Sequence, residues 1–154
     1  MGKLIALSGV FDSGKTSALL KVIDKLVSSG GKEKILYESV PRNHNKLQDK
    51  PRNKTSIITI NGIIIVVVTF GDDKVYIQNQ FERVEKEVEK ENITADVIIC
   101  ASRSEGYTYT LVEEIAKQKG MEFIRINKTR HETKTEQEKD NSDIADKIVK
   151  LAGF

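Results

Sequence analysis

The chain has 154 residues, a length that suits one domain with a core between three layers of secondary structure. Charged residues make up 31% of it but nearly cancel to a net charge of +2, which argues against a nucleic-acid partner. The single cysteine excludes an internal disulfide, and the longest apolar run, at 63–68, is too short to cross a bilayer. An apolar run that starts near the N-terminus leaves no room for a signal peptide. We therefore expect one domain over residues 1–154, in the cytoplasm and not in a membrane.

A glycine-rich segment joins the first two predicted elements. Residues 9–16 read GVFDSGKT and match the phosphate-binding pattern G-x-x-x-x-G-K-[ST] at every fixed position. The apolar run at 4–7 predicts a short buried strand before it, and apolar residues at helical spacing predict a helix over 16–27 after it. The SSGG sequence at 28–31 predicts the end of that helix.

The residue types in this segment suit a nucleoside triphosphate with Mg²⁺. Gly9 and Gly14 permit backbone angles at which consecutive N–H groups turn inward around a phosphate, at the positive N-terminus of the helix. Lys15 would neutralise the β- and γ-phosphates, and we expect it to be exposed without nucleotide. The Thr16 hydroxyl would bind Mg²⁺. Further predicted nucleotide contacts in this loop are Asp12, Ser13 and Ser17; Asp12 could instead shape the loop or act on an acceptor.

In this strand–loop–helix context, residues 9–16 resemble the P-loop of the P-loop NTPase superfamily. The resemblance implies that the chain binds ATP or GTP with Mg²⁺. It does not imply what is then done with the nucleotide.

A strongly basic segment follows the second predicted strand, which lies within 34–40. Residues 41–56, PRNHNKLQDKPRNKTS, carry five Lys or Arg side chains against one Asp. One interpretation is a solvated loop, because charged loops usually have no other role. The other is a lid beside the phosphates that attracts a small anionic acceptor.

A β-hairpin is the clearest signal after the glycine-rich segment. Asn61-Gly62 separates two runs of β-branched residues, at 56–60 and 63–70. The second run has no polar alternation, which predicts burial on both faces of a mainly parallel sheet. Asp72 follows, where P-loop proteins place the carboxylate that acts on Mg²⁺ through water. Asp73 is the second choice, and either residue could instead cap the next helix.

The rest of the chain alternates helices with strands, which predicts helices on both faces of the sheet. We expect helices over 74–91, 107–119 and 143–151, strands over 96–101 and 121–126, and a mobile loop over 128–142. Cys100 is interpreted as a small core residue rather than a nucleophile. Arg103 follows a strand at the edge where open α/β sheets bind ligands, so it could reach a phosphate or remain on the surface.

Three functions remain open at this point. A small nucleotide kinase would use Lys15 and Asp72, with Arg42, Arg52 and Arg103 serving phosphoryl transfer to a small acceptor. A nucleotide-dependent switch would instead rearrange 41–56 and 71–76 around the γ-phosphate and bind a protein partner.

The third possibility is a GTPase. Gly71-Asp72 and Asn127-Lys128-Thr129 are similar to the urease-accessory type of GTPase, in which an N-K-x-D motif reads the guanine base. The resemblance implies base contacts from Asn127 and Lys128. Arg130 stands where that motif has Asp, and this departure favours ATP.

Overall fold

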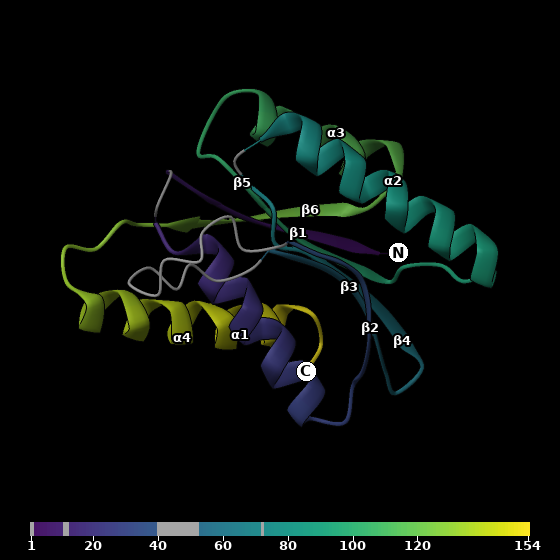
Figure 1. Ribbon diagram of the computed structural model, residues 1–154, viewed down its shortest axis with the longest axis horizontal. Coiled ribbons are helices and arrows are strands. Elements are labelled where there is room, and N and C mark those ends of the chain that lie inside the picture. Colours follow the sequence, from purple (N-terminus) through teal and green to yellow (C-terminus); the bar gives the residue numbers. More distant parts are fainter. Residues whose placement is uncertain (1, 11–12, 40–52, 72) are drawn as a thin grey trace.

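The computed structural model describes residues 2–10, 13–39, 53–71 and 73–154 (Figure 1). In this part of the chain, strands and helices alternate as an α/β fold. The strands are β1 (Lys3–Gly9), β2 (Lys32–Glu38), β3 (Lys54–Ile60), β4 (Ile63–Val68), β5 (Val97–Ser102) and β6 (Glu122–Lys128). The helices are α1 (Lys15–Ser28), α2 (Lys74–Glu91), α3 (Tyr107–Gln118) and α4 (Lys134–Leu151).

The strands form one mixed sheet in the order β2-β3-β4-β5-β1-β6. Strands β4, β5, β1 and β6 run parallel, whereas β3 is antiparallel to both of its neighbours. Figure 1 shows α1 and α4 on one face of the sheet and α2 and α3 on the other. The predicted α/β class, mainly parallel sheet and two helical layers are confirmed.

Strand β1 lies inside the parallel part of the sheet and is buried on both faces. The side chains of Ile5 and Leu7 belong to the core beneath α1 and α4, and those of Leu4 and Ala6 to the core beneath α2 and α3. All four have an exposed fraction of 0%. A strand covered on both sides is apolar at consecutive positions, which explains its unbroken apolar run.

The hairpin between β3 and β4 turns at Asn61-Gly62 as predicted. Both residues have positive φ, 51° and 78°, which suits the two-residue turn that matches the twist of the strands. However, β3 begins at Lys54, so the end of the predicted basic loop 41–56 is strand. Pairing with β2 and β4 satisfies its backbone, and the Lys54 ammonium lies 3.5 Å from a Glu33 carboxylate oxygen. Residues 41–52 lie outside the described residues.

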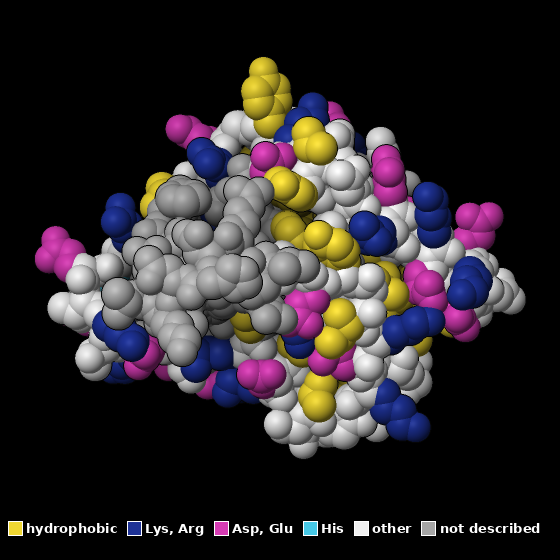
Figure 2. Space-filling model, in the orientation of Figure 1, with side chains coloured by type: hydrophobic (Ala, Val, Ile, Leu, Met, Phe, Trp, Pro, Cys, Tyr) yellow, Lys and Arg dark blue, Asp and Glu magenta, His cyan; other side chains and the backbone are white. Residues whose placement is uncertain are grey.

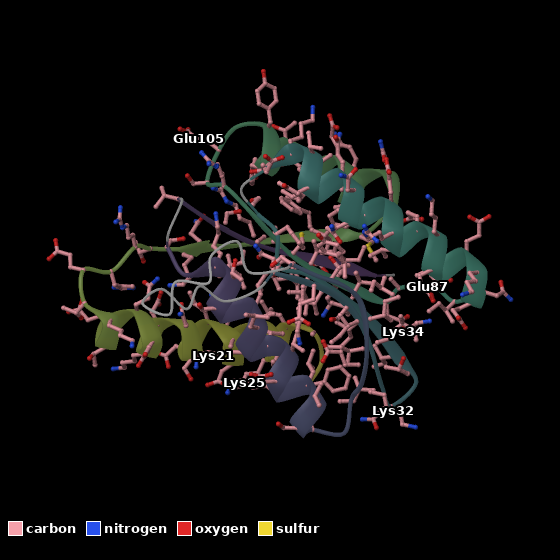
Figure 3. The ribbon with its side chains drawn as sticks, in the orientation of Figure 1. Lys21, Lys25, Lys32, Lys34, Glu87 and Glu105 are labelled. Carbon is pink, nitrogen blue, oxygen red and sulfur yellow. The ribbon has the colours of Figure 1, made fainter. Side chains whose placement is uncertain are left out.

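An ion pair ties the edge strand β2 to α2. Figure 3 shows Lys34 of β2 and Glu87 of α2 close together, and the Lys34 ammonium contacts the Glu87 carboxylate. The hydrogen bond raises the pKa of Lys34 and lowers that of Glu87. Both groups are in contact with solvent, so this pair contributes little to stability at ordinary salt.

The prediction of a mobile loop over 128–142 is wrong. Lys128 ends β6, and α4 begins at Lys134 rather than at 143. The side chain of Thr133 caps this helix, accepting a hydrogen bond of 3.2 Å from the Glu136 amide. The first half of α4 turns polar residues inward, among them the buried Asn141. The sequence of this first half therefore has no apolar stripe, although the segment is helical.

Two smaller expectations concern chemistry and membranes. Cys100 is fully buried among the apolar side chains under α2 and α3, and burial raises the pKa of its thiol far above the usual value. Its place in the core is confirmed. Across the described residues, no helix combines the length and apolar character needed to cross a bilayer.

Replacing the cap tests the start of α4. Thr133→Ala should lower the free energy of unfolding by about 1 kcal/mol, because the Glu136 amide loses its side-chain acceptor. Urea unfolding measures this. The control, Thr135→Ala, removes a threonine inside the same helix and should cost nothing, since alanine favours the helix. Equal losses in both variants would contradict the capping role.

Candidate functional site

The glycine-rich segment lies at the carboxyl edge of the sheet, between two neighbouring strand ends. It leaves β1 at Gly9 and enters α1 at Lys15. On one side, the hydroxyl of Ser8 lies 2.8 Å from that of Ser102 at the end of β5. On the other side, Gly9 pairs in register with Lys128 at the end of β6. This edge is where open α/β sheets bind ligands.

Both fixed glycines lie where a side chain would not fit. A Cβ on Gly9 would stand 2.7 Å from the Ser13 hydroxyl and 2.8 Å from the Lys128 carbonyl oxygen. Gly14 has a φ of 89°, and a Cβ there would collide with the Gln137 amide and stand 2.9 Å from the Asn141 side-chain oxygen. The pattern of glycines therefore reflects close packing of the loop against β6 and α4.

Lys15 is buried, contrary to our expectation that it would be exposed. Its residue is 4% exposed, and its ammonium donates a hydrogen bond of 2.7 Å to the Gly9 carbonyl oxygen. The side chain thus reaches back across the loop from the first turn of α1. A buried ammonium needs such an acceptor, and a loop carbonyl supplies it. The position allows the ammonium to exchange this carbonyl for an anion bound in the loop.

Three buried polar oxygens next to this loop have no hydrogen-bond partner in the part of the chain that the structure describes. They are the Ser13 hydroxyl, the Gln137 amide oxygen and the Asn141 amide oxygen. Ser13 is fully buried and Asn141 is 3% exposed. Because an unpaired buried polar atom is costly, such atoms beside a glycine-rich loop are typical of a site completed by a ligand or water.

The Thr16 hydroxyl takes part in a polar network that the sequence did not indicate. It donates a hydrogen bond of 3.0 Å to the Asn53 side-chain amide oxygen, and the Thr69 hydroxyl donates one of 2.9 Å to the same oxygen. Asn53 directly precedes β3 and Thr69 directly follows β4, so both lie at the carboxyl edge of the parallel strands. Asn53 was part of a polar segment without a motif, and no pattern in the sequence distinguishes it.

This donor set fits a hard cation only with help from other ligands. The Thr16 hydroxyl oxygen keeps lone pairs for such an ion, whereas the Asn53 amide oxygen already accepts two hydrogen bonds. Among the described residues, no three His, Cys, Asp or Glu side chains lie together as a metal cage. A Mg²⁺ held here would take further oxygens from phosphate and water, as is usual for this ion.

The acidic candidates after β4 are only partly described. Asp72, like Asp12 in the glycine-rich loop, lies outside the described residues. Asp73 caps α2, since its carboxylate accepts 2.8 Å from the Val75 amide and 3.3 Å from the Tyr76 amide. The capping interpretation is confirmed for Asp73. Gly71 packs against β5, because a Cβ on it would stand 2.7 Å from that of Ala101.

Four other predicted residues surround the loop at different depths. Ser17 lies in the first turn of α1 and is partly buried. Arg103 is exposed after β5, with its backbone amide donating 2.8 Å to the Thr108 hydroxyl. Asn127 is exposed and pairs with Ser8 in the register of β6 with β1. Lys128 is buried.

Lys128 forms the ion pair that connects β6 to α4. Its ammonium donates 2.7 Å to an Asp140 carboxylate oxygen, and the same oxygen lies 3.1 Å from a His131 ring nitrogen. The Lys128 side chain is 0% exposed and that of Asp140 is 25% exposed. Partial burial by itself would raise the pKa of Asp140, but Lys128 and His131 together lower it below the usual value.

Comparisons with protein-family models, with curated protein sequences and with solved structures give no match.

The ion pair predicts a pH-dependent loss of stability. Asp140→Asn should lower the free energy of unfolding by about 2 kcal/mol at neutral pH, because an amide leaves the buried Lys128 charge without its counterion. The pKa of Asp140 is depressed in the folded chain, so its contribution is full above the unfolded value of about 3.9 and fades as the pH falls further. The difference from wild type should therefore shrink in acid.

Urea unfolding at neutral and acidic pH measures this difference. Asp143→Asn, which removes an exposed carboxylate of the same helix, is the control and should leave stability within about 0.5 kcal/mol of wild type. A difference between wild type and Asp140→Asn that stays constant down to strongly acidic pH would contradict the ion-pair explanation.

Proposed function

We propose that the chain is a P-loop protein that binds a nucleoside triphosphate with Mg²⁺ through residues 9–17. The observation that carries this proposal is the ammonium of Lys15, which lies across the glycine-rich loop on the Gly9 carbonyl at 2.7 Å. An anion in the loop would meet this charge and the N-terminus of α1 together. The Ser13 hydroxyl of the loop, buried and without a hydrogen-bond partner among the described residues, supports the same conclusion.

The roles of the residues follow from their positions. The Lys15 ammonium would leave the Gly9 carbonyl for phosphate oxygens, and the backbone around Gly14 would turn its N–H groups toward them. Thr16 would give a hydroxyl oxygen to Mg²⁺, and Asp72 remains the proposed carboxylate acting on it through water. When bound, Mg²⁺ neutralises charge on the phosphate oxygens.

The preferred base in this proposal is adenine. Arg130 stands at the position where the guanine-reading motif has Asp, and the Lys128 ammonium is already paired with Asp140. Of the motif's base-reading Asn, Lys and Asp, the chain therefore keeps an exposed Asn127, a buried Lys128 and no Asp. GTP therefore remains the second choice.

The proposed reaction is Mg²⁺-dependent phosphoryl transfer to a small anionic acceptor, or hydrolysis of the triphosphate. Arg103 is exposed in the loop after β5, the strand adjacent to β1, so its guanidinium could meet an acceptor beside the phosphates. The basic residues at 41–52 would attract the same acceptor, but they lie outside the described residues. Catalysis would consist mainly of positioning and charge neutralisation.

A nucleotide-dependent switch that binds a protein is the second candidate. Val75 and Tyr107, in the first turns of α2 and α3, are 62% and 79% exposed. The Lys74 ammonium lies 5.3 Å from the centre of the Tyr107 ring, which brings the two helix starts together. Figure 2 shows hydrophobic side chains exposed over this region, beside the residues drawn in grey. Exposed apolar groups at a ligand-binding edge favour a protein partner.

Removing the Lys15 ammonium tests nucleotide binding. Lys15→Ala should abolish the thermal stabilisation that ATP with Mg²⁺ gives to the wild type, which is about 2.7 kcal/mol when ATP is at one hundred times its Kd. The physical reason is the loss of the cation that faces the bound phosphates. Differential scanning fluorimetry with ATP, ADP, GTP and GDP gives the measurement.

Lys21→Ala is the matched control, because it removes a lysine farther along the same helix (Figure 3). This variant should respond to ATP like wild type. A folded Lys15→Ala protein with unchanged ATP affinity would overturn the assignment. Stronger stabilisation of the wild type by GTP than by ATP would replace adenine by guanine in the proposal.

Acceptor-dependent release of ADP separates the two candidate functions. For a kinase, one member of a panel of nucleosides, nucleotides and small anionic metabolites should consume ATP stoichiometrically. Arg103→Ala should then lower kcat/KM for that acceptor about tenfold with ATP affinity unchanged, because it removes a charge that faces the acceptor. If no acceptor releases ADP, and a protein is retained only with a non-hydrolysable ATP analogue, the switch is the better account.

A further inference from the structure

The hydrogen bond between Thr16 and Asn53 links the glycine-rich loop to the far half of the sheet. The Thr16 hydroxyl donates its proton to the Asn53 amide oxygen at 3.0 Å. A hydroxyl that donates in this way turns its lone pairs toward other directions. We propose that Asn53 is a positioning residue, which accepts the Thr16 proton so that the Thr16 oxygen can coordinate Mg²⁺. This inference rests on the proposed function and extends it to a residue outside the motif.

The Thr16 and Thr69 hydroxyls both meet the Asn53 side chain at its amide oxygen. The Lys54 backbone amide donates a hydrogen bond of 2.9 Å to the Thr69 hydroxyl, which in turn donates one of 2.9 Å to Asn53. The Asn53 amide oxygen has two lone pairs, so it can accept the Thr16 proton as well.

Asn53 itself is held by the backbone on two sides. The backbone amide of Asn53 donates a hydrogen bond of 2.9 Å to the Ser39 hydroxyl, and its backbone carbonyl oxygen accepts one of 2.9 Å from the Ser39 backbone amide. The next residue, Lys54, accepts 3.0 Å from the Thr69 amide. These contacts come from the segments that end β2 and β4, so the acceptor is fixed before any ligand arrives. Such preorganisation is what an outer-shell residue of a metal site provides.

Thr16 is the second residue of α1, so no helical turn precedes it whose carbonyl could accept the hydroxyl proton. Asn53 holds the proton toward the strand ends instead. Coordination to a divalent cation makes a hydroxyl a stronger hydrogen-bond donor, so the bond to Asn53 should strengthen when Mg²⁺ binds.

The test compares ATP affinity with and without the metal. Isothermal titration calorimetry gives the Kd for ATP in excess MgCl₂ and in EDTA, and the ratio of the two values measures the Mg²⁺ effect. Asn53→Leu removes the acceptor at similar volume and should reduce this ratio about tenfold, leaving the affinity in EDTA unchanged. Asn53→Asp keeps an acceptor oxygen and should retain the Mg²⁺ effect.

Thr55→Val is the matched control for general damage to β3. Thr55 is buried in β3, and its hydroxyl donates a hydrogen bond of 2.8 Å to the Gln80 amide oxygen of α2, which lies on the face of the sheet opposite α1. Thr55→Val should lower the free energy of unfolding but leave the ratio of the two Kd values for ATP as in the wild type. If leucine prevents folding, Asn53→Val, which suits the start of a strand, replaces it.

The possible outcomes distinguish a failure of this inference from a failure of the proposed function. A wild-type Mg²⁺ effect in folded Asn53→Leu would overturn the role of Asn53 and leave nucleotide binding standing. Loss of the effect in Asn53→Asp, or an equal loss in Thr55→Val, would reduce Asn53 to a structural residue. If the wild type binds no ATP or GTP in either condition, the proposed function itself fails.

Discussion

The burial of β1 on both faces is the constraint on which the rest of the structure depends. Its side chains are shared between the core under α1 and α4 and the core under α2 and α3. A strand with no polar face can only lie inside a sheet, and here it lies between β5 and β6. The glycine-rich loop that follows must therefore leave the sheet between two strand ends, where backbone groups of β5 and β6 surround it.

Helix α4 completes one side of this loop with polar rather than apolar contacts. Gln137 and Asn141 lie so close to Gly14 that a Cβ on this glycine would displace their side chains, and their amide oxygens have no partner within the described residues. The Lys128–Asp140 ion pair fixes this half of the helix to the end of β6. Its inward polar side chains are costly unless they serve a ligand or the loop itself, which agrees with a site at this position.

The Asn53 side-chain amide connects the other side of the loop to the hairpin half of the sheet. Asn53 accepts hydrogen bonds from Thr16 of α1 and from Thr69 after β4. A change at the strand ends of β2, β3 and β4 would therefore be felt by the first turn of α1. This connection gives a physical route by which binding at the loop could be coupled to the segments that follow β2 and β4.

The sequence by itself determined the elements whose signal is local. The unbroken apolar run of β1, the helical spacing of apolar residues in α1 and the Asn61-Gly62 turn are signals carried by nearby residues, and all three elements lie where they were expected. Only the tertiary structure decided the role of Asn53 and the packing of α4 against the glycine-rich loop. Their conformations depend on partners distant in the chain, Thr16 on Asn53 and the loop on Gln137 and Asn141, and no local pattern encodes such contacts.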